Sequence, residues 1–318
     1  MLSQLYKMKN RGLLIIVILF MLLQPVGAQE ENPRKISKYD EKYSLVWVGL
    51  ETSTTSYINT ETKDSSGVML YTAPYFNYSH KSGFGISLKT QILAGGSQPG
   101  FYLSSVSPYF ATYTGKIYPY ISYARYFQHD NPSVPYTPIQ NEIYGHARIT
   151  TEFIEIITGV DIGFGKDEQN NNESVSDFNA FAGLSHLFAW YNLGANKNSA
   201  VAILPTLQLN AGTDRFFKYL RTASYISQNT NAKGMGYGGG NGGSPNGNQG
   251  GDPRTMNTGY TINEENNFGL SNIELNLYGM YFLGKFSIEP SGSLYFPLRG
   301  DDKNPYGYWQ LNLNYWIK

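Results

Sequence analysis

The chain has 318 residues, with 24 basic and 24 acidic side chains, no cysteine, 34 glycines and 27 tyrosines. The absence of cysteine excludes a disulfide-stabilised scaffold and a thiolate metal site, and the balanced charge is a poor match to a nucleic-acid-binding protein. A mean hydropathy of −0.35 excludes a polytopic helical membrane protein, which needs repeated apolar stretches of about 20 residues.

The N-terminal residues are typical of a secretory signal peptide. Basic side chains precede an unbroken apolar run at 13–23, and the small residues Val26 and Ala28 favour cleavage before Gln29. The apolar run is too short to span a bilayer. The predicted organisation is a signal peptide at 1–28, a periplasmic N-terminal tail at 29–42 and a single β-domain at 43–318.

From about residue 43 the sequence has a period of two, which is typical of β-strands. In the segment 139–153, Ile139, Ile143 and Ile149 alternate with polar residues such as Glu142 and Arg148. The expected strands exceed the usual length of about 5–6 residues, and about ten residues suffice for a tilted strand to cross a bilayer. We expect strands at 43–56, 67–79, 83–94, 103–113, 117–127, 139–151, 155–164, 176–190, 200–212, 266–281, 285–296 and 306–317.

The connections between these strands alternate in length. Short connections follow the even-numbered strands, whereas longer polar connections follow the odd-numbered strands, at 57–66, 128–138, 165–175, 213–265 and 297–305. This sorting predicts an all-β fold: a transmembrane antiparallel up-and-down β-barrel with short periplasmic turns and long extracellular loops. We expect about twelve strands. Because prolines fall inside several strands and tyrosine occupies both phases of two others, ten to fourteen strands remain open.

With its signal peptide, two-residue period, sorted connections and aromatic C-terminal strand ending Tyr315-Trp316-Ile317-Lys318, the sequence resembles the Gram-negative outer-membrane β-barrel proteins, a porin-like class. The resemblance covers residues 43–318 and implies a location in the outer membrane of a Gram-negative bacterium. It also implies contact with outer-membrane lipid, and with periplasmic chaperones and the barrel-insertion machinery during biogenesis. No nucleic-acid partner is expected.

Polar side chains on one phase of the strands are expected to face the interior of the barrel, where acidic groups modestly outnumber basic ones. These candidate lumen-lining residues are Lys89, Glu142, His146, Arg148, Glu155, Asp161, Asp177, Gln208, Asn210, Glu274, Lys285, Glu289, Gln310 and Asn312.

Aromatic side chains gather near the short turns, as in the aromatic girdle of a membrane barrel. The candidate girdle residues are Tyr78, Tyr113, Tyr118, Phe153, Trp190, Tyr191, Tyr281, Phe282, Tyr315 and Trp316. The connection 213–265 is distinctive because it contains a glycine-rich run that cannot bury a core. We expect an extracellular loop that is either a tolerated insertion or a contact for an envelope protein partner.

No constellation of residues supports catalysis, a cofactor or a metal site. Ser185 and His186 are sequence neighbours, so on a strand they point to opposite faces and cannot form a nucleophile–base pair. His146 shares an inward phase with Glu142 and Arg148, an arrangement that is more typical of a charge-paired lining than of an active site. The protein is therefore not expected to be an enzyme, although a lipid-modifying barrel stays the least favoured alternative.

The composition of the inward phase favours a narrow channel for ions or small solutes, with a weak preference for cations. The alternative is a non-conducting barrel that acts as a binding surface or accessory subunit of an envelope complex. Twelve strands lie between barrels that side chains fill and barrels that hold an aqueous pore, so the sequence leaves the openness of the lumen undecided.

Overall fold

A computed structural model of the protein describes residues 44–58, 65–94, 99–112, 115–129, 138–151, 153–168, 171–193, 199–213, 268–298 and 305–317. The predicted signal peptide at 1–28 and tail at 29–42 lie outside these residues, as does the loop 213–265 beyond Thr213. Within the described part of the chain, no helix is long and apolar enough to cross a membrane.

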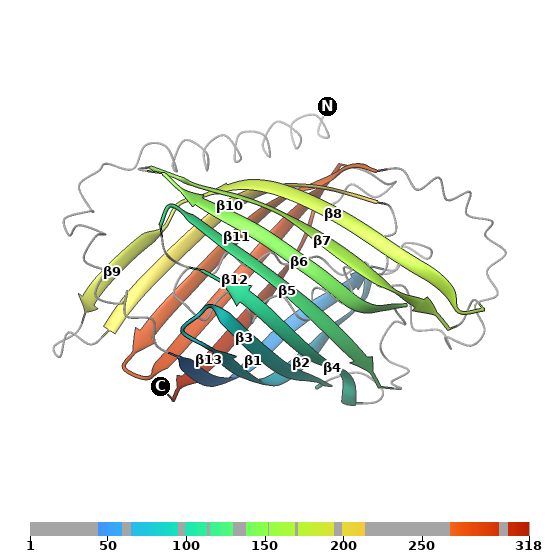
Figure 1. Ribbon diagram of the computed structural model, residues 1–318, viewed down its shortest axis with the longest axis horizontal. Helices are drawn as coiled ribbons and strands as arrows, with labels where there is room; N and C mark the ends of the chain where they lie inside the picture. Colours follow the sequence, from blue (N-terminus) through green and yellow to red (C-terminus); the bar gives the residue numbers. More distant parts are fainter. Residues whose placement is uncertain are drawn as a thin grey trace. The chain divides into compact units, whose positions relative to one another are not determined.

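The described residues form thirteen antiparallel strands (Figure 1). They are β1 (Leu45–Ile58), β2 (Ser65–Ser79), β3 (Phe84–Leu93), β4 (Gly100–Ala111), β5 (Ile117–Gln128), β6 (Ile139–Thr150), β7 (Glu155–Asp167), β8 (Glu173–Ser185), β9 (Phe188–Leu193), β10 (Ser199–Gly212), β11 (Gly269–Leu283), β12 (Phe286–Pro297) and β13 (Tyr306–Trp316).

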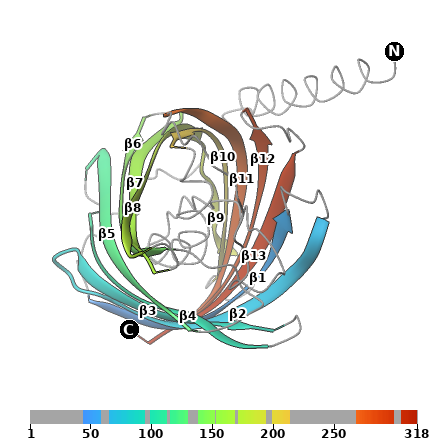
Figure 2. The same ribbon diagram turned by 90° about the vertical axis from the view of Figure 1, so that its right-hand side faces the viewer.

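Twelve of these strands close into a barrel, as the sequence predicted (Figure 2). Each of the twelve pairs with its neighbours in chain order, and β1 pairs with β13 to complete the ring. The closing register runs from Trp47 opposite Trp316 to Ser53 opposite Gln310. Closure satisfies the backbone donors and acceptors that would otherwise line two open sheet edges.

The thirteenth strand arises because the predicted strand 176–190 is interrupted. β8 pairs with β10 as far as Ser185 opposite Thr206, and β9 continues in the same register with Phe188 opposite Ile203. Between them, the His186 N–H donates to the Pro205 carbonyl at 3.3 Å. The reciprocal bond cannot form because proline has no N–H, so the ladder is broken at this point. The prediction of one continuous strand was wrong in this respect.

The other prolines that had left the strand count open also interrupt one ladder each, between β2 and β3 at Pro74 and between β11 and β12 at Pro290. Pro74 lies in β2 opposite Leu50, and Pro290 lies in β12 opposite Leu311. Neither proline shifts the register of its strand, so neither creates a bulge. The barrel therefore tolerates these prolines through a short gap in one ladder rather than through a change in the number of strands.

The two ends of the barrel differ in their connections. We call the end with the connections 80–83, 112–116, 151–154 and 284–285 the turn rim, and the opposite end the loop rim. One loop is shorter than predicted: β7 extends to Asp167 and β8 begins at Glu173, so the connection is 168–172 rather than 165–175. At the turn rim, the connection between β8 and β10 is longer than predicted, because it contains β9.

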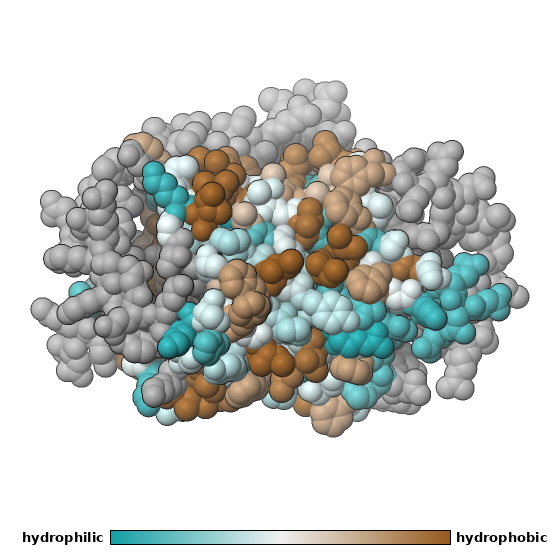
Figure 3. Space-filling view, in the orientation of Figure 1, coloured by the Kyte–Doolittle hydropathy of each residue, from teal (hydrophilic) through white to brown (hydrophobic). Residues whose placement is uncertain are grey.

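Burial alternates along the strands with the expected period of two. In β12, Ser287 and Glu289 are buried, whereas Phe286 and Ile288 are exposed. The exposed phase carries mostly apolar side chains, and the space-filling view shows them spread over the strands (Figure 3). The polar phase faces the interior, which is the inverse of a water-soluble sheet protein and the pattern of a membrane barrel.

Two tyrosines inside the barrel pack against a glycine on the neighbouring strand. Tyr75 lies opposite Gly49, and Tyr109 lies opposite Gly85. A Cβ at either glycine would overlap the facing tyrosine ring. The missing side chain therefore lets the ring lie across the neighbouring strand, where a larger residue would push it toward the barrel axis.

Candidate functional site

The interior of the barrel contains nearly all of the predicted lumen-lining residues. Lys89, Glu142, Arg148, Glu155, Asp161, Asp177, Gln208, Asn210, Glu274, Glu289, Gln310 and Asn312 are buried, and His146 is half-buried. They come from eight different strands, so closure of the sheet rather than proximity in sequence brings them together.

Lys285 is placed differently from the prediction. It lies with Gly284 in the two-residue turn between β11 and β12, and its side chain is exposed. Gly284 has a φ of 61°, so the chain turns at this position and the two-residue alternation of β11 ends. The sequence pattern assigned Lys285 to the interior because it counted this residue as the first of the strand 285–296. The strand begins one residue later, at Phe286, so its alternation does not include Lys285.

One interior cluster is centred on Glu51, which the sequence analysis missed. The Lys89 ammonium forms an ion pair with Glu51 Oε1 at 2.7 Å, and the Tyr71 hydroxyl donates to the same oxygen at 3.1 Å. Gln310 Nε2 donates to Glu51 Oε2 and to Asn312 Oδ1, each at 2.9 Å. Glu51 shares its phase with buried Ser53, whereas Val48 and Leu50 face outward. That alternation was the signal that could have identified it.

A second cluster connects four strands near the turn rim. Glu289 in β12 accepts hydrogen bonds from the Tyr278 hydroxyl at 2.7 Å, from Ser287 Oγ at 2.8 Å and from Asn314 Nδ2 at 2.7 Å. The Tyr75 hydroxyl, which passes over Gly49, donates to Asn314 Oδ1. Tyrosines from β2 and β11 thus approach the same carboxylate–amide pair from two sides and fill part of the interior.

A third cluster lies on β10, β11 and β12. Glu274 Oε1 accepts from the Tyr295 hydroxyl at 2.9 Å and from Ser293 Oγ at 3.2 Å. On the adjacent strand, Asn210 Nδ2 donates to Asn272 Oδ1 at 2.8 Å. These groups satisfy one another, as buried polar groups must.

Carboxylates dominate the wall formed by β6, β7 and β8. Glu142 lies opposite Gly163, which lies opposite Asp177, so no side chain separates the two acids. Asp161 occupies the next inward position of β7. Glu142 accepts a hydrogen bond from the Tyr126 hydroxyl at 2.5 Å. Glu142 and Asp177 lie nearer the loop rim than the turn rim, so this half of the interior is strongly acidic.

Arg148 lies on the same wall near the turn rim, on β6. Its Nη1 atom is 3.4 Å from Glu155 Oε2, and that oxygen also accepts from Ser185 Oγ at 3.4 Å. His146, two residues earlier, stacks on Tyr120 with a centroid distance of 5.2 Å.

The buried charges of the described interior are unbalanced. Seven carboxylates, at Glu51, Glu142, Glu155, Asp161, Asp177, Glu274 and Glu289, accompany only two basic groups, at Lys89 and Arg148. Both basic groups have a carboxylate within ion-pair distance. The described interior therefore holds five more buried acidic side chains than buried basic ones.

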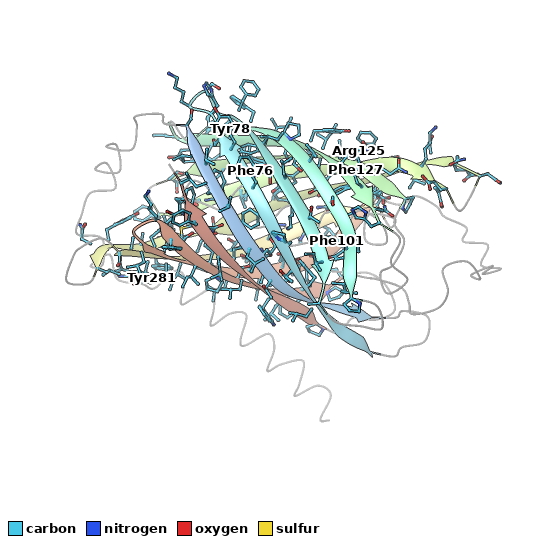
Figure 4. The ribbon with its side chains drawn as sticks, turned by 90° about the horizontal axis from the view of Figure 1, so that it is seen from below. Phe76, Tyr78, Phe101, Arg125, Phe127 and Tyr281 are labelled. Carbon is cyan, nitrogen blue, oxygen red and sulfur yellow. The ribbon has the colours of Figure 1, made fainter. Side chains whose placement is uncertain are left out.

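The candidate girdle residues divide between the two faces of the barrel. Tyr78, Trp190, Tyr281, Tyr315 and the turn residue Phe153 lie on the outside, and Figure 4 shows Tyr78 and Tyr281 there. Tyr191 is exposed, but it follows Trp190 in β9 and therefore has the opposite phase. Tyr118, Phe282 and Trp316 instead share the inward phase, and Trp316 stacks on Trp47 inside the barrel. Tyr113 lies outside the described residues. The aromatic residues at this rim thus serve two environments, which composition alone cannot separate.

Neither His186 nor His146 is paired with a serine as a base is with a nucleophile. Ser185 points inward to Glu155, whereas His186 Nδ1 contacts the Phe153 carbonyl oxygen at 2.6 Å. Ser122 lies opposite Tyr144 rather than His146. Among the described residues, no group of three or more His, Asp or Glu side chains is arranged to hold a metal ion.

No protein-family model and no curated protein sequence matches this chain. Solved structures do resemble it in fold. An outer membrane channel from Pseudomonas putida F1 aligns over 93% of this chain and 100% of its own, with 7% identity and a TM-score of 0.41. A mutant porin from Rh. blastica and OccAB3 from Acinetobacter baumannii each align over 86% of this chain and 99% of their own, with TM-scores of 0.28 and identities of 8% and 9%.

Proposed function

We propose that this protein is an outer-membrane β-barrel that forms a narrow passage for small cations. The proposal rests on the barrel itself: a closed sheet has an apolar outer face and a polar, acidic interior. Among sheets, only a closed barrel satisfies the backbone hydrogen bonds of every strand in lipid. Carboxylates that line a channel favour cations. The short connections would face the periplasm and the long ones the cell exterior.

The excess of interior carboxylates carries this proposal. Glu142 and Asp177 face one another across Gly163 on the loop-rim side of the wall. A cation that enters from the loop rim would meet them before it reached the Tyr75–Asn314–Glu289–Tyr278 cluster. That cluster connects β2, β13, β12 and β11, so it would form the narrow section of the passage.

Planar bilayer recordings in a potassium chloride gradient would test the proposal. We expect a small conductance with a reversal potential that indicates a preference for potassium over chloride. The double variant Glu142→Gln/Asp177→Asn should lose much of that preference. Glu168→Gln/Glu173→Gln is a matched control, because it also removes two negative charges, but from exposed positions at the loop rim. An unchanged reversal potential in the double variant would contradict the proposed role of the interior carboxylates.

A second candidate function is a non-conducting barrel that acts as a binding surface or accessory subunit of an envelope complex. The observation in its favour is the second cluster, near the turn rim. Its tyrosines Tyr75 and Tyr278 fill part of the interior with hydrogen-bonded side chains. A barrel that conducts no ions, either intact or without residues 213–265, would favour this function. Loss of a co-purifying envelope protein on deletion of that loop would then identify the surface.

A further inference from the structure

Three consecutive inward side chains of β6 carry buried polar atoms that have no hydrogen-bond partner among the described residues. They are His146 at Nδ1, Arg148 at Nη1 and Nη2, and Thr150 at Oγ1. Buried polar groups are almost always satisfied by protein, ordered water or a ligand. A run of three such residues on one strand face therefore leaves several polar groups that a bound molecule could satisfy.

Among these three residues, Arg148 has the most buried atoms without a hydrogen bond, at Nη1 and Nη2. Only 2% of its side chain is exposed, and its contact with Glu155 Oε2 at 3.4 Å lacks the geometry of a hydrogen bond. The other buried base, Lys89, instead contacts Glu51 Oε1 at 2.7 Å. A guanidinium has five N–H donors in a flat fork. Both terminal nitrogens of Arg148 thus lack a hydrogen bond, although Nη1 lies in an ion pair with Glu155 Oε2.

We propose that this wall of β6 binds the carboxylate of a small zwitterionic solute, of the chemical class of the amino acids. The flat fork of Arg148 matches the two oxygens of a carboxylate. The Thr150 hydroxyl and the His146 ring nitrogen flank the fork on the same face and add donors. Glu155, which lies beside Arg148, provides an acceptor for the ammonium group of the solute.

The surrounding charge selects a zwitterion over a simple anion. Glu142, Asp177 and Glu274 line the loop-rim half of the interior, and Asp161 lies midway along β7. An isolated anion on its way to Arg148 is repelled by these carboxylates, whereas a solute with its own ammonium group is not. This route rests on the proposed passage through the barrel, but binding at Arg148 does not require ion conduction.

Calorimetric titration of the full-length protein, folded in detergent, tests the site. Glycine serves as the zwitterion, and acetate and methylamine carry its two charges separately. We expect glycine to bind, with acetate and methylamine at least tenfold weaker. Arg148→Met should weaken glycine binding at least tenfold, and Glu155→Gln or Thr150→Val about threefold or more. Arg125→Met is a matched control, because Arg125 faces outward and donates to Asn141 Oδ1 at 3.0 Å.

The outcomes separate the site from the passage. Wild-type protein that does not bind glycine, or Arg148→Met protein that binds it normally, would overturn the inference even if the barrel conducts cations. Acetate that binds as tightly as glycine would overturn the zwitterion specificity. Glycine binding that depends on Arg148 in a barrel without conductance would uphold the site and contradict the proposed passage. If Arg148→Met does not fold, Arg148→Lys keeps the charge without the fork and should bind glycine at least threefold more weakly.

Discussion

Trp47 and Trp316 stack inside the barrel with ring centroids 5.0 Å apart and an interplanar angle of 27°. They are directly opposite residues of β1 and β13, so the first and last strands are joined by aromatic contact as well as by backbone hydrogen bonds. Trp316 Nε1 also donates to Ser287 Oγ at 3.3 Å, and its ring lies near Phe282. The closing seam of the barrel is thereby packed at the turn rim.

Replacement of Trp316 by alanine should weaken this seam. The change removes the ring stack and the Nε1 hydrogen bond, and large-to-small changes of a well-packed aromatic cost about 3 kcal/mol or more. Because Trp316 is only half-buried, we expect a loss of about 2 kcal/mol in the free energy of unfolding. Urea unfolding in detergent, followed by tryptophan fluorescence and by gel mobility without heating, would measure it. Ile317→Ala, on the outer face, should cost less; equal losses would contradict a special role for the seam.

Gly49→Ala should destabilise the barrel, because the new Cβ would overlap the Tyr75 ring. Over-packing of an interior typically costs about 1–3 kcal/mol. Gly145→Ala is the matched control, since the nearest atom to its Cβ would be the Tyr120 carbonyl oxygen at 3.7 Å. The difference between the two unfolding midpoints measures the effect. The double variant Gly49→Ala/Tyr75→Leu should recover part of the loss, and no recovery would show that the ring is not the obstacle.

Glu51→Gln should be more damaging than the simultaneous change of Glu51 and Lys89. The single change leaves the Lys89 ammonium, 3% exposed, without the carboxylate at 2.7 Å. Removal of one partner of a buried ion pair costs about 3 kcal/mol or more, whereas replacement of both can be nearly neutral. A double-mutant cycle of Glu51→Gln with Lys89→Met, read from unfolding free energies, would give the coupling. Additive effects would contradict a direct interaction.

Pro205→Ala should join β8 and β9 into one strand. Alanine supplies the N–H that can donate to the His186 carbonyl, opposite which it lies. We expect slower amide hydrogen exchange at Phe188 and Trp190, by several-fold, because the ladder with β10 becomes continuous. Pro74→Ala is the comparison, since it should leave exchange in β9 unchanged. Unaltered protection at Phe188 would show that proline is not the cause of the break.

The cation preference of the proposed passage should decline with salt. The electrostatic screening length falls from about 10 Å at 0.1 M to about 3 Å at 1 M ionic strength. Preference that arises from carboxylates along a water-filled wall should therefore be largest in dilute potassium chloride, as measured by the reversal potential under a fixed concentration ratio. The Glu142→Gln/Asp177→Asn variant should show little salt dependence. A preference that persists unchanged at 1 M would point to direct contact at the narrow section instead.

Most of the fold could be predicted because strand phase is a local property. In β6 the alternation of Ile143 and Ile149 with Glu142 and Arg148 is visible in the sequence, and burial follows it. The errors occur where the phase is interrupted. Lys285 lies in a turn, and the strand at 176–190 breaks opposite Pro205, a residue that belongs to a different strand. Local pattern contains no information about which residue lies opposite.

The sequence by itself determined a closed barrel of about twelve strands, with ten to fourteen left open, and with an apolar outer phase and a polar, acidic inner phase, because lipid and lumen impose a period of two on every strand. Only the tertiary structure decided which inward side chains meet. Register and closure place Glu51 against Lys89, and Tyr75 over Gly49. They also leave Arg148 with unused donors between His146 and Thr150. These contacts join strands that are distant in sequence, so their partners are set by the stagger of the whole sheet.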